Sequence, residues 1–225
     1  MCGIFGEFGH SLLNKETFLN INSLSKKRGP DMSGYWSDNN ICQLGFNRLS
    51  ILDLTKKGNQ PMVSSNENWV MVMNGEVYNY PEIREKLGKS KGYYSSRTDS
   101  EVVLSAFEIW GVSKTLKNLN GIFAIGLYDK QNSRIHLIRD FAGVKPLYFG
   151  IYNNTLVFAS QYDQIFTHPE IKKKLTPNHH SLTDFVRLGY IPSPNAFFKG
   201  TGQVDPGQVI SFDRDCNIET MKTYS

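Results

Sequence analysis

Apolar residues in this chain fall into short runs and alternating stretches, separated by turns rich in Asn, Asp, Gly and Pro. Runs of this length predict strands, and a short polar turn between two of them predicts a hairpin. The strands expected on this basis are residues 2–8, 34–37, 41–49, 69–73, 121–129, 134–139, 147–152, 155–160, 208–213 and 218–223. A sharp turn is expected at Asn74-Gly75-Glu76, directly after one of these strands.

Helical patterns lie between these runs. The expected helices are residues 15–26, 81–87, 98–110, 161–167 and 182–188. Asn14 is the expected cap of the first helix, and Thr98 with Glu101 forms a capping box for the third, which Gly111 should end. Residues 191–207 are expected to form an extended loop. Antiparallel strands punctuated by helices indicate an α+β fold with packed layers rather than a parallel βαβ sheet.

Composition indicates the broad class of protein to which this chain belongs. A chain of 225 residues, 40% hydrophobic and 20% charged, is typical of a soluble globular protein. The net charge is only +4, and the basic spots are scattered, so neither nucleic acid nor a membrane surface is an expected partner. No apolar run approaches the ~20 residues of a membrane span, and the start lacks a secretory pattern, which predicts a cytoplasmic protein.

The chain has three cysteines and no C-x-x-C pair, so neither a disulfide framework nor a metal site is expected. Cys42 alternates with Leu44 and Phe46 on one strand face and is expected in the core. Cys216 lies in a polar turn and has no expected role.

Cys2 is different because removal of Met1 makes it the N-terminal residue, with a thiol and a free α-amine on one carbon. The two groups titrate near pH ~8.5 and ~7.7–8.0, so a proton can pass between them at little cost. An amine-activated nucleophile of this kind attacks carbonyl groups. The apolar pair after Gly3 predicts a strand start that fixes Cys2 at a buried edge, with Gly3 and Gly6 admitting another backbone or a ligand. Taken alone, such a residue is more often an ordinary half-buried thiol, and the remaining motifs decide for chemistry.

Polar groups from three further stretches of the chain suit one substrate. Asn74-Gly75 can offer an amide and a backbone N–H to a developing oxyanion. Arg48 can clamp a carboxylate in a bidentate fork, and Asp99 with Glu76 can receive an ammonium group. Together with a thiol nucleophile, these groups fit an α-amino acid that carries a reactive carbonyl in its side chain, as glutamine does.

Each group also has an ordinary interpretation. Arg48 could form a surface ion pair, Asp99 could simply begin a helix, and Asn-Gly is a common turn dipeptide. A histidine base is not indicated, because all five histidines lie away from these stretches, which leaves the α-amine as the best base. The histidines are His10, His136, His168, His179 and His180.

The motifs together resemble a known family. They are MCGIFG at the start, KRGPD at 27–31, NRLSILD at 47–53, NGEVYN at 74–79, RTDSE at 97–101, LNGIFAIGLYD at 119–129 and RDFAGVKPLYF at 139–149. This order resembles the class II glutamine amidotransferase domain, most of all the N-terminal glutaminase domain of glutamine-hydrolysing asparagine synthetases. The likeness runs to about residue 160 and continues more loosely through LTDFVRLGYIPSPNAFFKG and DPGQVISFD.

The resemblance implies an N-terminal-nucleophile hydrolase fold, a four-layer αββα sandwich of two antiparallel sheets between helices. It also implies that Cys2 is the nucleophile, its α-amine the base, and Asn74 with Gly75 the oxyanion hole. The residues implied to bind glutamine are Arg48 at the α-carboxylate, Glu76 and Asp99 at the α-amine, and the backbone of Leu49, Ser50, Ile51 and Leu52, with Asn74 and Gly75 at the reacting amide.

Two departures from the family pattern stand out. Lys27 replaces the usual His before Arg-Gly-Pro-Asp, and little loss of activity is expected from that change. We expect one amidotransferase domain over residues 1–225, with its core in 2–190 and a loop and hairpin in 191–225 that lead toward an absent synthetase domain. No phosphate-binding Gly-rich loop occurs, so no cofactor is expected in this chain, and ATP with Mg²⁺ is expected only in the missing synthetase domain.

The expected function is hydrolysis of L-glutamine to L-glutamate and ammonia through a Cys2 thioester, with the ammonia serving an ATP-dependent amidation of aspartate. The expected partners are L-glutamine, a synthetase domain or subunit and a second copy of the chain. The alternatives are an amidotransferase for another acceptor, alone or with a partner, a hydrolase of another amide, and a non-catalytic regulatory module. Degenerate copies should lose Cys2, Arg48 or Asp99, and this sequence keeps all three.

Overall fold

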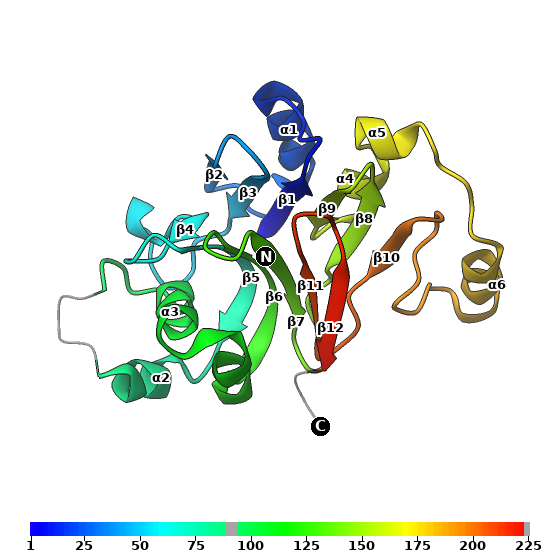
Figure 1. The fold of residues 1–225 in the computed structure, drawn as a ribbon. Coiled ribbons are helices and arrows are strands. Elements are labelled where there is room, and N and C mark those ends of the chain that lie inside the picture. The colour runs from blue at the N-terminus through cyan, green and yellow to red at the C-terminus, as the bar shows by residue number, and fades with distance from the viewer. Residues whose placement is uncertain (89–93, 223–225) are drawn as a thin grey trace.

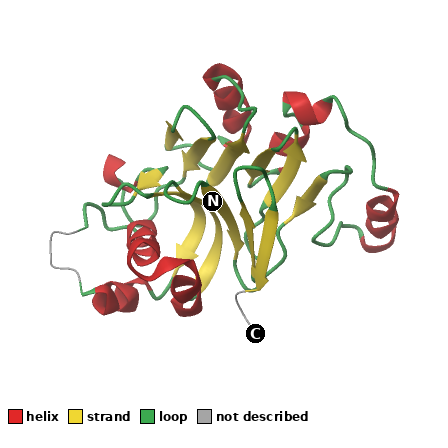
Figure 2. Ribbon diagram, viewed as in Figure 1, coloured by secondary structure: helices red, strands yellow, loops and turns green. Residues whose placement is uncertain are grey.

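The computed structural model describes residues 1–88 and 94–222, and within them two six-stranded antiparallel sheets face each other (Figures 1 and 2). The first sheet has the order β10 (Thr201–Gln203), β8 (Tyr148–Tyr152), β9 (Thr155–Ala159), β1 (Gly3–Gly9), β3 (Cys42–Arg48), β2 (Met32–Ser37). The second has the order β12 (Ile218–Lys222), β11 (Gln208–Phe212), β7 (Arg134–Arg139), β6 (Gly121–Asp129), β5 (Trp69–Val77), β4 (Met62–Val63).

Helices cover the outer face of each sheet. The first sheet carries α1 (Lys15–Asn22), α4 (Tyr162–Phe166) and α5 (Pro169–Lys172), and the second carries α2 (Tyr80–Leu87) and α3 (Asp99–Asn118). Helix α6 (His179–Leu188) lies beside the body of the molecule (Figure 1). Single-turn 3₁₀ helices occupy Ser23–Ser25 and Lys56–Gly58.

Three apolar layers hold these four structural layers together. Successive side chains of a strand point to opposite faces, so each strand of a central sheet serves two layers. In β1, Ile4 packs between the sheets, whereas the next residue, Phe5, packs against Phe18 of α1 on the outer face. Cys42, Leu44 and Phe46 share the layer between the sheets, as their alternation predicted. The expected α+β sandwich, two antiparallel sheets between helices, is confirmed.

The predicted turn at Asn74-Gly75-Glu76 is wrong. Strand β5 runs straight through these residues to Val77, and Asn74, Gly75 and Glu76 pair with Ala124, Phe123 and Ile122 of β6. Gly75 is needed for a close approach rather than a turn, because a Cβ atom there would lie 2.1 Å from the carbonyl oxygen of Ile122. Pairing along the whole of β6 overrides the local turn preference of Asn-Gly.

The helix predictions need smaller corrections. Helix α1 ends at Asn22, and the expected span to residue 26 continues only as the 3₁₀ turn. The first stretch of α3 ends at Gly111 as expected, where φ is 72°, but a second helical stretch follows to Asn118. The C-terminal helix α6 begins at His179, ahead of the expected residue 182, with Asn178 as its cap. Asn14 and Thr98 cap their helices as predicted.

Short elements in polar segments escaped prediction. Helix α5, strand β4 and strand β10 were not expected, and β10 lies inside residues 191–207, which were expected to be loop throughout. Strand β2 starts at Met32, two residues ahead of its predicted start. These pieces owe their regular structure to a neighbour: β10 pairs with β8, and β4 pairs with β5. The end of the last predicted strand, residue 223, lies outside the described residues.

The environment of Cys2 also differs from expectation. Strand β1 lies inside its sheet, between β9 and β3, so Cys2 lies at the end of a central strand and not at a sheet edge. Gly3 and Gly6 make room for side chains rather than for backbone or ligand. A Cβ atom at either position would lie 2.3 Å from Ser25 Oγ or from the Phe158 ring.

Cys216 packs against the layer between the sheets and is half-buried, although its turn is polar. All three cysteines are free. Within the described residues, no helix combines the length and the apolar character that crossing a bilayer requires.

Candidate active site

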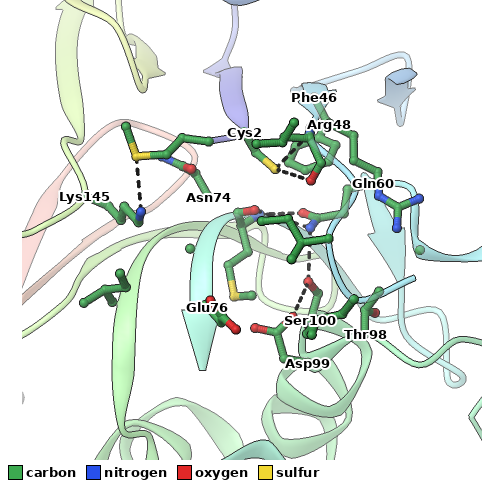
Figure 3. A pocket seen from close by; sticks show the side chains of 18 residues that line it. Cys2, Phe46, Arg48, Gln60, Asn74, Glu76, Thr98, Asp99, Ser100 and Lys145 are labelled. Atoms are coloured by element: carbon green, nitrogen blue, oxygen red, sulfur yellow. Dashed lines mark hydrogen bonds between the residues drawn. The ribbon is translucent and has the colours of Figure 1, made fainter. Parts of the chain in front are cut away.

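A cavity of about 260 Å³ lies where the ends of β1 and β3, the middle of β5 and the start of α3 meet (Figure 3). Antiparallel pairing places Gly3 of β1 opposite Asn47 of β3, so the residue before Gly3 lies beside the end of β3. The second sheet and α3 supply the facing wall. The sequence-predicted residues that line the cavity are Cys2, Arg48, Leu49, Ile51, Leu52, Asn74, Gly75, Glu76 and Asp99. Ser50 does not line it, and its amide donates to Asp31 Oδ2 at 2.7 Å.

The thiol of Cys2 is held by one backbone residue. The amide of Leu49 donates to Sγ at 3.4 Å, and the carbonyl of Leu49 lies 3.7 Å from the same atom (Figure 3). Burial raises the pKa of the Cys2 thiol, and the nearby Asp99 charge adds to this effect. The Leu49 N–H, the chain terminus and Arg48 counteract part of it. The thiol is therefore protonated at neutral pH and needs a base to become a nucleophile.

Asn74 brings an unsatisfied amide to the same cavity. Its side chain is 1% exposed, and no group among the described residues accepts a hydrogen bond from its Nδ2. A buried donor without a partner costs about 1–3 kcal/mol, so such groups are rare in folded proteins and concentrate where they serve a ligand. Asn74 therefore offers a donor that a negatively charged oxygen could use.

Two carboxylates lie close together at the other end of the cavity. Asp99 Oδ2 accepts from the amide of Val77 at 2.8 Å, and Oδ1 accepts from the amide of Ser100 at 2.8 Å. Burial raises the pKa of Asp99, and the charge of Glu76 raises it further against these hydrogen bonds. Figure 3 shows the two carboxyl groups side by side, one from β5 and one from α3. Paired acids in a partly dry site favour a bound cation.

Arg48 does more than line the cavity. Its guanidinium donates to the carbonyl oxygen of Thr55 at 2.6 Å and to that of Asp53. The Asp53 side chain accepts from the amides of Arg97 at 2.9 Å and of Thr55 at 2.8 Å, and these bonds, Arg97 first, lower the pKa of Asp53 to about 2. The loop beside the cavity is thus folded around Arg48. The remaining N–H groups of the guanidinium's five are the ones available to a ligand.

Sequence reasoning missed four polar residues that line the cavity, Gln60, Thr98, Ser100 and Lys145, and had assigned Thr98 only as a helix cap. Lys145 lies 3.2 Å from the sulfur of Met1 through its Nζ, and its own amide donates to Asp140. Ser100 and Lys145 fall inside motifs that the sequence displays, but nothing in the pattern of Gln60 marks it. None of the five histidines, all of them in described segments, lines the cavity. Among the described residues no cluster of three His, Cys, Asp or Glu side chains could hold a metal ion.

Comparison with known proteins follows this geometry. The family model for the glutamine amidotransferase domain matches residues 1–225. A protein of Methanocaldococcus jannaschii named putative asparagine synthetase [glutamine-hydrolyzing] 2 is 36% identical over 96% of this chain and 44% of its own length. Asparagine synthetase [glutamine-hydrolyzing] 1 of Bacillus subtilis is 32% identical over 100% of this chain and 35% of its own. The chain thus spans less than half of the length of these curated relatives.

Solved structures agree on the fold. The glutamine phosphoribosylpyrophosphate amidotransferase of B. subtilis superimposes with a TM-score of 0.72 at 15% identity, covering 99% of this chain and 49% of that one. A structure titled as the allosteric regulatory enzyme of purine biosynthesis gives 0.70 at 17% identity, with the same coverage. At this identity the match concerns the N-terminal-nucleophile hydrolase fold alone, which the sequence resemblance had implied. The family match over the whole chain, together with a cysteine at position 2 beside this cavity, shows that the chain belongs to the class II glutamine amidotransferase domain family.

Proposed function

We propose that this domain hydrolyses L-glutamine to L-glutamate and ammonia through a thioester on Cys2. The sulfur adds to the side-chain carbonyl carbon of glutamine, and the thiol proton passes to the α-amine of Cys2. The carbon–nitrogen bond then breaks, and the amine returns the proton to the departing ammonia. Water attacks the thioester, glutamate leaves, and the thiol regains its proton.

The observation that carries the proposal is the free donor of Asn74 in the cavity that holds the thiol. During addition of sulfur, negative charge develops on the carbonyl oxygen, and a preorganised donor stabilises it. Gly75 stands next to Asn74 in β5 and also lines the cavity. In this proposal the pair forms the oxyanion hole.

Recognition of the amino-acid end rests on charge. Glu76 and Asp99 receive the ammonium group, because a bound cation offsets the repulsion between two neighbouring carboxylates. Arg48 receives the α-carboxylate with the N–H groups that the loop does not use, and the segment of Leu49, Ile51 and Leu52 encloses the aliphatic part. Arg48 thus has two tasks, since it also shapes the loop that closes this side of the cavity.

The destination of the ammonia is a further part of the proposal. The relatives are named as glutamine-hydrolysing asparagine synthetases and are longer than this chain. We therefore assign the acceptor role to an asparagine-synthetase-type domain or subunit that amidates aspartate with ATP and Mg²⁺. In this proposal no step of that second reaction is assigned to this chain.

We place the reaction in the cytoplasm, where a free thiol such as that of Cys2 persists. Fractionation of the host cells with antibody to the chain tests this location. We also expect the chain to form a homodimer, and measurement of its oligomeric state in solution tests this expectation.

The experiment compares two reagents on one thiol. A diazo-ketone analogue of glutamine carries both charged groups, whereas iodoacetamide carries neither. The analogue should label Cys2 rapidly in the unsubstituted protein, called the parent below. It should label Cys2 slowly in Asp99→Asn, which keeps the shape of the side chain but removes its charge. Iodoacetamide should label both proteins at similar rates. Equal responses of the two reagents to Asp99→Asn would refute an amino-acid substrate and favour a hydrolase of another amide.

Glutamate release by the parent completes the test. A parent that binds glutamine without releasing glutamate would favour the non-catalytic module. Release that persists in Cys2→Ala would show that another group is the nucleophile.

A further inference from the structure

The side-chain amide of Gln60 is buried, and both of its N–H groups donate hydrogen bonds to other residues. Its Oε1 accepts from the amide of Met73 at 2.6 Å, and its Nε2 donates to the carbonyl of Met73 at 3.3 Å and to Ser100 Oγ at 3.3 Å (Figure 3). The side chain is 5% exposed. A primary amide has two N–H donors, and both are engaged here. Gln60 therefore lines the cavity without a donor to offer a substrate.

The side chain of Gln60 takes the place that a neighbouring strand would occupy beside Met73 of β5. Strand β4 contains only Met62 and Val63, which pair with Met71 and Val70 of β5. Following the antiparallel register back from β4 leads to Met73, where the described part of the chain places no further strand on this side of the sheet. Gln60 supplies there one acceptor and one donor, the two groups that a neighbouring strand would have offered. The backbone of Met73 is thus satisfied immediately before Asn74.

The third bond continues to the other end of the cavity. Ser100 Oγ receives the Nε2 hydrogen of Gln60 and lies 3.4 Å from Asp99 Oδ1, to which its own hydroxyl donates. The second oxygen of Asp99 accepts from the amide of Val77. The chain of bonds leaves β5 at Met73 and returns to it at Val77. The three residues between these anchors are the ones that face the proposed substrate.

We infer that Gln60 is a positioning residue that holds the two ends of the glutamine site in register, Asn74 at the reacting amide and Asp99 at the ammonium group. The inference rests on the proposed function. It assigns to Gln60 no contact with substrate, because its donors are used. Linked hydrogen bonds of this kind strengthen one another in a dry environment, so loss of the central amide loosens both ends.

The test separates kcat from KM. Gln60→Met keeps the volume but removes all three bonds, and should lower kcat for glutamine hydrolysis by roughly 10- to 100-fold because Asn74 is no longer held in place. It should also raise KM through Asp99. Ser100→Ala removes the hydroxyl that joins Gln60 Nε2 to Asp99 Oδ1 but leaves both bonds between Gln60 and Met73 in place. It should therefore raise KM with kcat unchanged. The KM effects of the two substitutions should not add in the double variant, since both act through one chain.

Gln203 provides the matched control. Its Nε2 also donates to two backbone carbonyls, those of Ile191 at 3.2 Å and Asn195 at 2.9 Å, and its side chain is similarly buried but outside the cavity. Gln203→Met should lower the unfolding midpoint and leave both kinetic constants unchanged. Should Gln60→Met behave in the same way, the inference is overturned.

If Gln60→Met does not fold, Gln60→Glu serves instead, because a carboxylate retains the acceptor for Met73 but loses both donors. The same kinetic criterion applies to it. Hydrogen exchange at the amide of Met73 gives a readout that needs no activity. Exchange should be slow in the parent and faster in Gln60→Met, and equal exchange in the two proteins refutes the strand-replacing role. Failure of the parent to hydrolyse glutamine would count against the proposed function and leave this exchange result to decide for or against Gln60.

Discussion

At the scale of single residues, the site depends on groups that ordinary folding would not leave as they are. A protein gains by pairing buried donors, yet Asn74 Nδ2 has no acceptor among the described residues. A buried thiol gains by staying neutral, yet Leu49 points its amide at Cys2 Sγ, an arrangement that favours the thiolate. The unpaired Asn74 donor costs stability, and both features suit a reaction that develops charge on a carbonyl oxygen and on sulfur.

Asn74→Ala should lower kcat for glutamine hydrolysis by about 10²–10³, the usual loss on removing one oxyanion donor. KM should change little, because that donor bonds to the reacting oxygen and matters most in the transition state. Steady-state glutamate release measures both constants.

The matched control for that substitution is Asn79→Ala. The side chain of Asn79 donates to the carbonyl of Asn118 at 2.8 Å and accepts from the amide of Asn120 at 2.9 Å, and it lines no part of the cavity. Asn79→Ala should reduce stability and leave kcat alone. Equal kcat in Asn74→Ala and the parent would return Asn74 to a purely structural role.

Met1 should be absent from active protein. While Met1 is attached, the nitrogen of Cys2 is an amide without basicity, and the Met1 side chain lines the cavity with its sulfur on Lys145 Nζ. Intact-mass measurement on active protein should therefore show the chain beginning at Cys2. A preparation that retains Met1 should hydrolyse glutamine poorly but still react with iodoacetamide. Full activity with Met1 in place would mean that the base is another group.

At the scale of elements, the strands of the second sheet are held to their neighbours by polar groups of two kinds. Strand β5 is anchored by hydrogen bonds to Gln60 and Asp99, whereas the β7–β11 pair buries a histidine. His136 lies 7% exposed, bonds Ser211 Oγ through Nδ1 at 2.7 Å and packs against the ring of Trp69. The second kind of anchor makes the sheet sensitive to acid.

Burial lowers the pKa of His136 to about 4, with the Arg134 charge acting in the same direction and Asp129 and Glu219 against it. An unfolded histidine titrates near ~6.5, so below that pH the unfolded chain binds a proton that the folded chain refuses. The stability from neutral His136 is present above pH ~6.5 and is lost as the pH falls toward 4.

We expect the free energy of unfolding of the parent to fall by ~2 kcal/mol between pH 7 and pH 5 on this account. Urea unfolding of His136→Gln, which can keep a hydrogen bond to Ser211, should show a smaller fall. The exposed His180→Gln should follow the parent. A parallel pH dependence in the parent and His136→Gln would rule out this source of acid sensitivity.

At the scale of the whole molecule, the cavity exists only because two sheets face each other. The first sheet contributes Cys2 and Arg48, the second contributes Asn74 and Glu76, and a helix outside the second sheet contributes Asp99. Among the described residues, no single element contains both the proposed nucleophile and the proposed oxyanion donor. A ligand that touches all of them therefore stabilises the assembled sandwich against the unfolded chain.

Cys2→Ala should bind glutamine without consuming it, which allows that stabilisation to be measured. At a glutamine concentration 100 times Kd, the stability should rise by about 2.7 kcal/mol, or roughly 5–10 °C in Tm for a domain of this size. D-Glutamine should give no comparable rise. Cys2→Ala combined with Asp99→Asn should lose most of the shift, and an undiminished shift would show that the acids do not hold the ammonium group.

Much of the fold follows from local sequence. Asn14 and Thr98 cap their helices as predicted, Gly111 ends the first stretch of α3, and the alternation of Cys42, Leu44 and Phe46 marks the inner face of β3. These features depend on residues that are neighbours in the chain, through capping bonds and side-chain period. The α+β class and the candidate residues of the site were accessible for the same reason, because each motif is contiguous.

Only the tertiary structure decided what those residues do together. Asn74-Gly75 lies in a strand because β6 pairs with it along its whole length. Arg48 shapes a loop because the carbonyls of Asp53 and Thr55 come within its reach, and Gln60 enters the site because β4 stops short of Met73. Each of these outcomes depends on a partner brought close by packing, and a pattern of single positions carries no record of such a partner. The sequence by itself therefore determined which chemistry the chain carries, and the folded sandwich determined which groups are free to perform it.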